Sequence, residues 1–196
     1  LLSRRKADLL IKQGRVFLNG RKAIIGEKAD PLSDNILVDG KDLPKKLNHK
    51  VLLLNKPHGV ISTCHDNHGR KTILSLIPYN LRRGIYPIGR LDSDSRGAIL
   101  LTNNGDLTLK LTHPKYSHKK TYLVWLSGQP SQSKLNKWRN GILLDGKITM
   151  PATIEVMEVV NQKTLLKIIL KEGRNRQIRK IADLIGHPVQ DLQRIA

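Results

Sequence analysis

The sequence of 196 residues contains a single cysteine, Cys64, so no disulfide bond can form within the chain. This absence excludes a small secreted domain stabilised by disulfides and fits a reducing compartment, so we expect a cytoplasmic protein. No apolar run approaches the roughly 20 residues needed to span a bilayer, and no signal peptide is visible. Internal repeats and low-complexity segments are also absent.

Acidic residues are scarce. The chain has 16 Asp and Glu against 35 Lys and Arg, which gives a formal net charge of +19 and a pI near 10.3. This excess predicts a polyanionic partner, above all a nucleic acid. An anionic membrane is the weaker alternative, because we find no basic amphipathic helix with a Trp/Phe/Leu face. Long blocks of like charge are missing and 39% of the residues are hydrophobic, so we expect a packed protein.

The chain divides into two regions of different texture. In residues 1–43, Ser3 is a candidate helix N-cap, Gly14 a helix terminator, and Asn19-Gly20 a hairpin signal between short strands at 16–18 and 36–38. Residues 44–50 are polar and basic and are interpreted as a linker. Residues 51–196 form the second domain. Because the chain begins with Leu1 and ends in a strand-like run, we expect both ends to be incomplete.

The second region mixes strands and helices without regular alternation. This predicts an α+β fold with a mixed, largely antiparallel sheet, preceded by a small α/β module. The apolar run at 51–55 has the pattern of a buried strand. Expected strands span 51–55, 85–88, 98–102, 121–126, 154–160 and 165–170, and expected helices span 73–77, 106–112, 131–139 and 175–185.

Asp92 is the leading candidate for chemistry. It lies where an apolar strand enters a polar turn bounded by glycines, with Arg90 and Arg96 on either side. Neighbouring positive charge favours an ionised carboxylate, which can act as a base or as a nucleophile. Spacing alone favours a structural carboxylate that caps the turn and pairs with an arginine, since most loop carboxylates are structural. A calcium loop beginning at Asp92 is excluded, because Asn103 stands where a bidentate Glu is needed.

The segment 89–105 resembles the catalytic motif of the small-subunit/large-subunit rRNA group of pseudouridine synthases, the RsuA/RluB type. That motif runs Gly-Arg-Leu-Asp, two variable residues, Thr, one variable residue, Gly, and an apolar strand ending in Thr-Asn-Asp-Gly. This chain departs from it at Ser95, Ala98 and Asn104. The segments 53–63, 120–124 and 172–180 resemble further motifs of this family in the same order, and residues 3–20 resemble its S4 RNA-binding module.

The resemblance implies roles for individual residues. Asp92 would be the essential carboxylate, Tyr122 would stack on the flipped uracil and help proton movement, and Arg179 would pair with Asp92. Arg90 would position the extruded nucleotide, and Leu170 would pack beneath the base. Further substrate contacts are expected from Lys56, Arg176 and Lys180. In the S4 module, RNA contacts are expected from Ser3, Arg4, Arg5, Lys6, Lys12, Arg15 and Asn19.

Each assignment has a structural alternative. Tyr122 on a strand fits sheet packing equally well, and Arg176 and Lys180 share a helix face that phosphates or solvent could cover. Cys64 and His68 lack a second pair at zinc-ligand spacing, so no metal site is expected. Isomerisation requires no oxidation or hydrolysis, so no cofactor is expected either.

The expected partner is ribosomal RNA or a precursor of a ribosomal subunit, bound by a monomer, either in the cytoplasm or in an organelle with bacterial-type ribosomes. Two rival functions remain. A non-catalytic S4-type RNA-binding or ribosome assembly protein explains the charge but not the set of Asp92, Tyr122 and Arg179. A metal-dependent nuclease would need more clustered carboxylates than the sequence offers.

Overall fold

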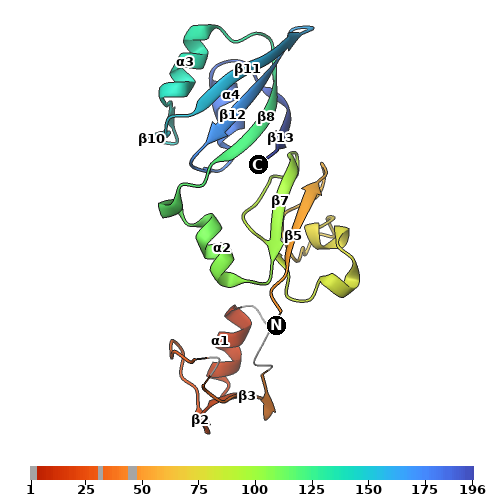
Figure 1. Ribbon diagram of the computed structural model, residues 1–196, viewed down its shortest axis with the longest axis vertical. Helices are drawn as coiled ribbons and strands as arrows, with labels where there is room; N and C mark the ends of the chain where they lie inside the picture. The colour runs from red at the N-terminus through yellow and green to blue at the C-terminus, as the bar shows by residue number, and fades with distance from the viewer. Residues whose placement is uncertain (1–3, 31–32, 44–47) are drawn as a thin grey trace. The chain divides into compact units, whose positions relative to one another are not determined.

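A computed structural model describes residues 4–30, 33–43 and 48–196 (Figure 1). The chain forms two compact units, Leu1–His49 and Lys50–Ala196. Their division lies inside the segment 44–50 that the sequence suggests as a linker, of which residues 44–47 fall outside the described part. Ser3, the expected N-cap, also lies outside the described residues.

The first unit combines one helix with a small sheet. Helix α1 (Arg4–Lys12) is followed by β1 (Val16–Leu18), β2 (Arg21–Lys22), β3 (Ile36–Val38) and β4 (Lys41–Asp42), in the sheet order β2-β1-β3-β4. The predicted Asn19-Gly20 turn joins β1 to β2, and both residues have positive φ, which this residue pair tolerates. Strands β2 and β4 were not predicted, because two residues show no periodicity.

The second unit is built on one mixed sheet in the order β11-β12-β8-β13-β7-β5, with β6 also paired to β7. Only the β13–β7 pairing among these ladders is parallel, so the predicted mixed, largely antiparallel sheet is confirmed. Its strands are β5 (Val51–Lys56), β6 (Tyr86–Pro87), β7 (Arg96–Thr102), β8 (Lys120–Ser127), β11 (Thr153–Val160), β12 (Lys163–Leu170) and β13 (Val189–Arg194).

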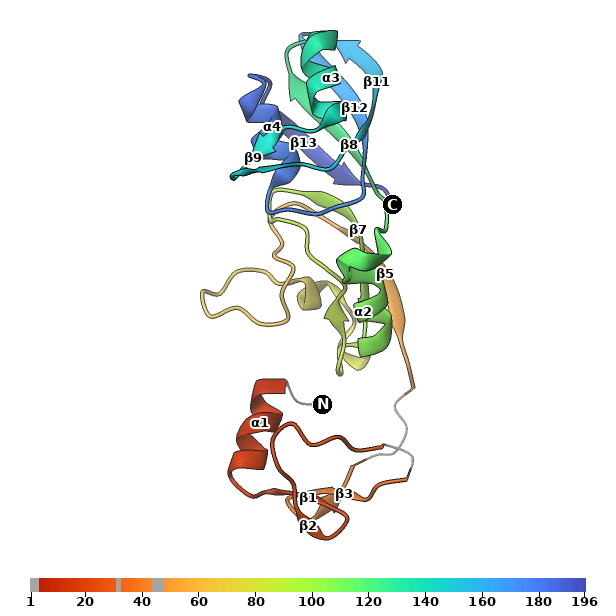
Figure 2. The same ribbon diagram turned by 90° about the vertical axis from the view of Figure 1, so that its left-hand side faces the viewer.

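Helices and short elements complete this unit. Helix α2 (Gly105–Thr112) follows β7, α3 (Gln132–Asn140) follows β8, and α4 (Gln177–Leu184) precedes β13; the short helices are η1 (Ile73–Leu76), η2 (Tyr79–Leu81) and η3 (Pro114–Tyr116), and the hairpin β9 (Leu143–Leu144) and β10 (Lys147–Ile148) lies between α3 and β11. Figure 2 shows the segment between β5 and β7 extending as a long loop away from the strands. No helix in the described part is long and apolar enough to cross a membrane.

The parallel junction of β7 and β13 depends on Gly97. Its φ is +110°, and an added Cβ would lie 2.7 Å from the Arg194 amide nitrogen. Both the backbone conformation and the close approach therefore require glycine. This junction brings the C-terminal strand beside the loop that precedes β7, so it fixes where residues 92–95 lie relative to β8.

The core of this unit follows the predicted helix stripe. Ile178, Ile181 and Ala182 of α4 are buried against the sheet, as their spacing indicates, and Trp138 of α3 is fully buried. The predicted buried character of β5 is wrong in part. Leu53 is 73% exposed, because side chains alternate along this edge strand and one of its faces is open to solvent.

Candidate active site

A pocket of about 780 Å³ opens in the second unit, where the loop before β7 faces the segment before α4. Strands β8, β12 and β13 contribute its apolar floor, and the segment between α2 and β8 forms another wall. Six of the sequence-predicted residues line it: Arg90, Asp92, Tyr122, Leu170, Arg176 and Arg179. These residues lie as much as 89 positions apart in the chain, so the fold brings together what the motifs predict as a set.

The loop that carries Asp92 is held by its backbone on both sides. The Ser62 hydroxyl donates to the Leu91 carbonyl at 2.7 Å and accepts from the Leu91 amide at 3.1 Å. On the other side, the Gly59 amide donates to the Ser93 carbonyl at 2.8 Å. The segment between β5 and β7 therefore fixes the position of Asp92, whose side chain remains 40% exposed toward the pocket.

Arg176 is the cation nearest to Asp92 among the ion pairs of the described residues. Its Nη1 lies 3.7 Å from the Asp92 carboxylate, and its Nη2 lies 3.0 Å from that of Asp94. Arg176 occupies the N-cap position of α4 with a left-handed φ of +50°, which turns the chain into the helix. The sequence predicts a phosphate contact or a solvated side chain here. The structure shows that this guanidinium, 42% exposed, also has two carboxylate neighbours.

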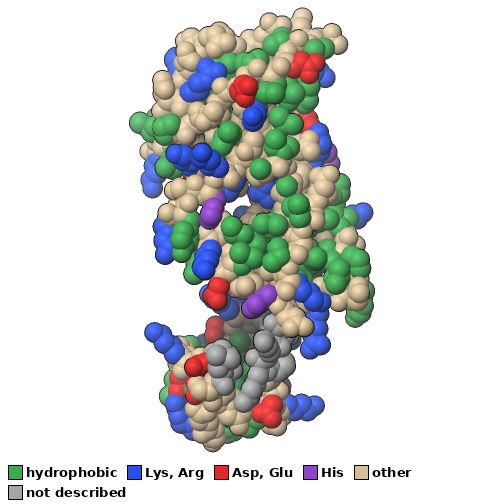
Figure 3. All heavy atoms as spheres, viewed as in Figure 1, with side chains coloured by type: hydrophobic (Ala, Val, Ile, Leu, Met, Phe, Trp, Pro, Cys, Tyr) green, Lys and Arg blue, Asp and Glu red, His purple; other side chains and the backbone are tan. Residues whose placement is uncertain are grey.

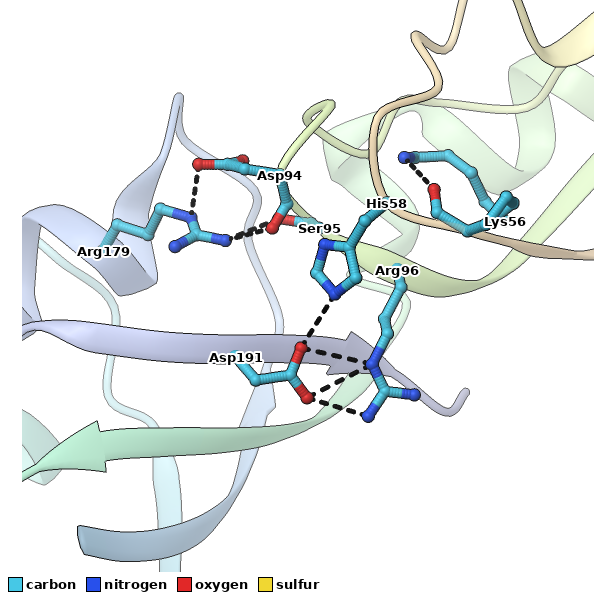
Figure 4. A network of polar contacts seen from close by, with 8 residues as sticks. Lys56, His58, Asp94, Ser95, Arg96, Arg179 and Asp191 are labelled. Carbon is cyan, nitrogen blue, oxygen red and sulfur yellow. Dashed lines mark hydrogen bonds and ion pairs between the residues drawn. The ribbon is translucent and has the colours of Figure 1, made fainter.

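The predicted ion pair between Arg179 and Asp92 is not formed. Arg179 pairs with Asp94: its Nη2 donates to the Asp94 carbonyl at 2.6 Å, and its Nε lies 3.3 Å from the Asp94 carboxylate (Figure 4). The same Nη2 also reaches the Ser95 hydroxyl at 3.3 Å. The physical reason is that α4 runs beside the far end of the turn, so Arg179 holds the loop two residues beyond Asp92.

Asp94 is accordingly the structural carboxylate of this loop. Its partial burial would raise its pKa, but the hydrogen bond from Arg176 and the charge of Arg179 outweigh that effect and lower the pKa overall. An ionised Asp94 can therefore pair with both arginines. The Asp92 carboxylate, which is exposed to a similar extent, has only the longer 3.7 Å ion pair with Arg176 among the ion pairs of the described residues.

Tyr122 forms part of the pocket floor and is only 8% exposed. It stands opposite Arg194 in the β8–β13 ladder and opposite Ile168 in the β8–β12 ladder. Burial raises the pKa of its phenol, an effect that the charge and hydrogen bond of Arg194 oppose and that the charge of Asp92 reinforces. Leu170, 3% exposed, adds an apolar surface to the same floor.

Two predicted substrate contacts lie outside the pocket lining. The Lys56 ammonium is completely buried and donates to the carbonyls of Pro57 at 2.9 Å and Val60 at 2.7 Å. It therefore shapes the turn after β5, and burial lowers its pKa. Lys180 pairs with Asp145 at 2.6 Å. Arg96, which the sequence places beside Asp92, turns away from it toward β13.

Comparison with known proteins decides the family. The sequence profile of the RNA pseudouridylate synthase family matches residues 50–183. This chain belongs to that family. Ribosomal large subunit pseudouridine synthase B of Bacillus subtilis (strain 168) is 41% identical over 98% of this chain and 79% of the relative. Dual-specificity RNA pseudouridine synthase RluF of Escherichia coli (strain K12) is 36% identical over 99% of this chain and 65% of the relative.

A solved structure agrees with the sequence comparisons. The crystal structure of a pseudouridylate synthase superimposes with a TM-score of 0.68 at 30% identity, covering 98% of this chain and 82% of the other. The fold assigned above is thus that of a pseudouridine synthase. The enzyme class predicted from the four collinear motifs is confirmed, and the rival metal-dependent nuclease is not supported.

This pseudouridine synthase contains a network of side-chain hydrogen bonds, the clasp made by Arg174 and Glu172, that the sequence did not predict. Arg174 donates to the carbonyls of Lys147 at 2.9 Å and Ile148 at 2.6 Å, and its Nε reaches Glu172 at 3.2 Å. Glu172 in turn accepts from the Met150 amide at 2.9 Å. The clasp therefore fixes the β9–β10 hairpin and Met150 beside the pocket. The motif 172–180 contains both charged residues, but nothing local in it indicates their partners.

A second missed network joins three separate elements. Asp191 on β13 accepts from Arg96 of β7 at 2.8 Å and lies 3.0 Å from the His58 ring nitrogen (Figure 4). The Arg96 hydrogen bond lowers the pKa of Asp191. His58 belongs to the turn that also holds Ser93, so this network ties the turn after β5 to the parallel junction of the sheet.

Most charged side chains that line the pocket are basic. Figure 3 shows Lys and Arg side chains scattered among apolar ones on one face of the molecule. Within the described part of the chain, no group of three or more His, Cys, Asp or Glu side chains is placed to hold a metal ion. The pocket therefore offers carboxylate, phenol and guanidinium groups to a ligand.

Proposed function

We propose that this pseudouridine synthase isomerises a specific uridine of ribosomal RNA, with Asp92 as its catalytic carboxylate. The observation that carries the proposal is the placement of Asp92, 40% exposed, in one pocket with Tyr122 and Leu170. Ribosomal RNA is the proposed substrate because the Bacillus subtilis relative is named for the large ribosomal subunit and because this chain carries a net charge of +19.

The proposed reaction breaks the N1–C1′ bond of uridine, rotates the uracil, and forms a C5–C1′ bond. The proton on C5 is released and N1 gains one, so atoms and electrons balance without an external reagent. Asp92 has two routes to start this sequence: its carboxylate attacks C1′, or it removes the C2′ proton to give a glycal. Both routes need an accessible carboxylate, which the Asp92 position provides.

The other pocket residues are proposed to hold the base and the nucleotide. Extruding a uridine from its stack costs a few kcal/mol, which contacts in the pocket must offset. Tyr122 and Leu170 present ring and methyl surface to the uracil, and Arg90 is placed at the exposed end of the loop to contact the nucleotide. Arg176 stabilises negative charge at Asp92, and Arg179 positions the loop through Asp94.

The first unit is proposed to be an S4-type RNA-binding module that holds the same RNA, with the enzyme acting as a monomer. Two of its predicted contacts also have internal roles. Arg15 makes a two-point ion pair with Asp39 at 2.6 Å, and Asn19 bonds to Asp34 at 2.9 Å. RNA contacts are assigned first to the α1 side chains Arg4, Arg5, Lys6 and Lys12 because all four are exposed and basic.

The proposal is tested by tritium release from 16S and 23S rRNA transcripts labelled at uridine C5. We expect stoichiometric release from one of the two, insensitive to EDTA, and a pseudouridine mapped at the position concerned. A non-catalytic S4-type RNA-binding or ribosome assembly protein would bind the same transcripts without releasing tritium. Release from neither transcript by a folded, RNA-binding protein would overturn the proposal.

A further inference from the structure

Exposed aromatic rings are rare in the described part of this protein. Tyr79, 87% exposed, and Tyr116, 43% exposed, are the two tyrosines that belong to its exposed residues, while Trp138 is fully buried and Tyr122 nearly so. Tyr116 ends η3 in the segment between α2 and β8. Tyr116 itself is not among the lining residues, but its ring centroid lies 6.4 Å from that of His113 and 6.0 Å from that of His118. Both histidines line the pocket, so the Tyr116 ring stands beside the pocket at its rim.

The segment that presents Tyr116 is rigidly organised. The His113 ring accepts from the Lys115 amide at 3.2 Å and so caps η3, and the His118 ring lies 3.0 Å from the Lys110 carbonyl of α2. The two histidine rings stand 6.4 Å and 6.0 Å from the Tyr116 ring, one edge-on and one tilted. The tyrosine is therefore presented in one orientation before any ligand arrives, which lowers the entropic cost of binding.

A lysine lies over this ring. The Lys115 ammonium is 4.8 Å from the Tyr116 ring centroid, and Lys120, four residues after Tyr116 in the chain, lines the pocket. An exposed aromatic ring among lysines is the combination that binds single-stranded nucleic acid, because the ring stacks on a base while the ammonium groups contact phosphates. No apolar partner surface is needed to explain the exposure of Tyr116.

We propose that Tyr116 is a stacking platform for the base next to the target uridine. This inference rests on the proposed function. When a uridine is extruded into the pocket, the base beside it loses a stacking neighbour. A ring at the rim replaces that neighbour, and the exposed lysines Lys115 and Lys119 contact the adjoining phosphates. The occupant is thus an unpaired nucleotide of the substrate RNA.

The test compares Tyr116→Ala with Tyr116→Phe and with Tyr79→Ala. Tyr79 is the matched control, since it is also an exposed tyrosine with a basic side chain near its ring, but none of residues 76–82 lines the pocket. The probe is a fluorescein-labelled RNA of about 12 nucleotides, with one uridine flanked by adenosines, measured by anisotropy. We expect Tyr116→Ala to weaken binding roughly tenfold, and the other two variants to bind like the wild type.

A second probe separates stacking from a structural effect of the substitution. In it, one adenosine beside the uridine is replaced by an abasic residue. We expect the abasic probe to bind the wild type and Tyr116→Phe more weakly, whereas Tyr116→Ala should bind both probes equally. The stacking role of Tyr116 is refuted if the abasic residue weakens binding equally in all variants. It is also refuted if Tyr116→Ala binds the intact probe as tightly as the wild type does.

The two proposals fail in different ways. RNA binding to both probes is measured without turnover. If the abasic probe binds the wild type more weakly than the intact probe does, but both probes bind Tyr116→Ala equally, and no tritium is released from rRNA, only the proposed function is refuted. If the Tyr116→Ala variant releases tritium at the normal rate, and if the abasic substitution weakens RNA binding equally in the wild type and in this variant, only the proposed stacking role of Tyr116 is refuted. Thermal unfolding of each variant confirms that it is folded before binding is compared.

Discussion

Arg179 is paired with Asp94 and not with Asp92, although Asp92, in the same loop, is the proposed catalytic carboxylate. Its guanidinium bonds to the Asp94 carbonyl at 2.6 Å and approaches the Asp94 carboxylate at 3.3 Å. Arg179 therefore pairs with Asp94, while the Asp92 carboxylate has Arg176 at 3.7 Å and remains 40% exposed to a substrate. Arg179 is thus a positioning residue, and Asp94 is the group through which it acts.

Substituting Arg179 should lower turnover more than substrate affinity. Arg179→Gln removes charge-assisted hydrogen bonds worth about 1.5–3 kcal/mol each, so we expect kcat to fall roughly ten- to a hundredfold while KM changes little. Arg179→Lys should restore only part of the lost kcat, because an ammonium group cannot reproduce the planar, multi-donor geometry of a guanidinium. Steady-state tritium release measures both constants. Lys180→Ala, which removes an exposed ion pair with Asp145, is the control, and an equal loss there would contradict the assignment.

Tyr122→Phe should lower kcat without changing the shape of the pH–rate profile. Burial raises the pKa of Tyr122 above its ordinary value of 10.0, so the phenol stays protonated throughout neutral pH. A raised pKa moves its deprotonation further into alkali, and the alkaline limb below about pH 9 must belong to another group. Profiles of kcat from pH 6 to 9 should therefore run parallel for the two proteins. An alkaline limb that disappears in Tyr122→Phe would show that the phenol ionises in this range.

Asp191→Asn should reduce stability at neutral pH and lose that effect in acid. Arg96 lowers the pKa of Asp191 in the folded protein, so the pair stabilises above the unfolded value near 3.8 and ceases to do so as pH falls through the folded value. We expect a difference of about 1 kcal/mol at pH 7, since the pair is partly screened by solvent. Denaturant titrations at pH 7 and below pH 4 measure it. A difference that persists unchanged in acid would assign it to packing.

Arg174→Ala should release the β9–β10 hairpin. Three carbonyls of this hairpin accept from the Arg174 guanidinium, and exposed hydrophobic side chains such as Ile148 contribute little packing of their own. We expect amide exchange at residues 143–148 to accelerate at least roughly tenfold, with little change in the β8–β12 ladder. Hydrogen exchange read by mass spectrometry resolves the two segments. Unchanged exchange in the hairpin would show that its own turn suffices.

The sequence predicted local structure better than contacts between side chains far apart in the chain. The stripe of Ile178, Ile181 and Ala182 and the turn at Asn19-Gly20 depend on neighbours within a few residues, and both appear as expected. The exposure of Leu53 was missed, because a run of apolar residues gives no sign that its strand lies at a sheet edge.

Long-range polar contacts were predictable only in part. The motifs correctly gathered Asp92, Tyr122 and Arg179 into one pocket, but they could not say which carboxylate Arg179 would meet. Lys56 is buried because the turn after β5 presents backbone carbonyls to its ammonium group. Arg96 meets Asp191, 95 residues later in the chain, because β7 and β13 pair in parallel. Such contacts are set by topology, which no spacing within one motif specifies.

The central claim is tested most directly by single-turnover tritium release from the rRNA substrate with Asp92→Asn. Asp145→Asn is the matched control, since it also removes one carboxylate from this unit but lies outside the pocket lining. We predict that Asp92→Asn binds the RNA at least as tightly as the wild type and releases tritium at least roughly a thousandfold more slowly, while Asp145→Asn reacts normally. Release by Asp92→Asn at the wild-type rate would contradict the assignment of Asp92 as the catalytic carboxylate.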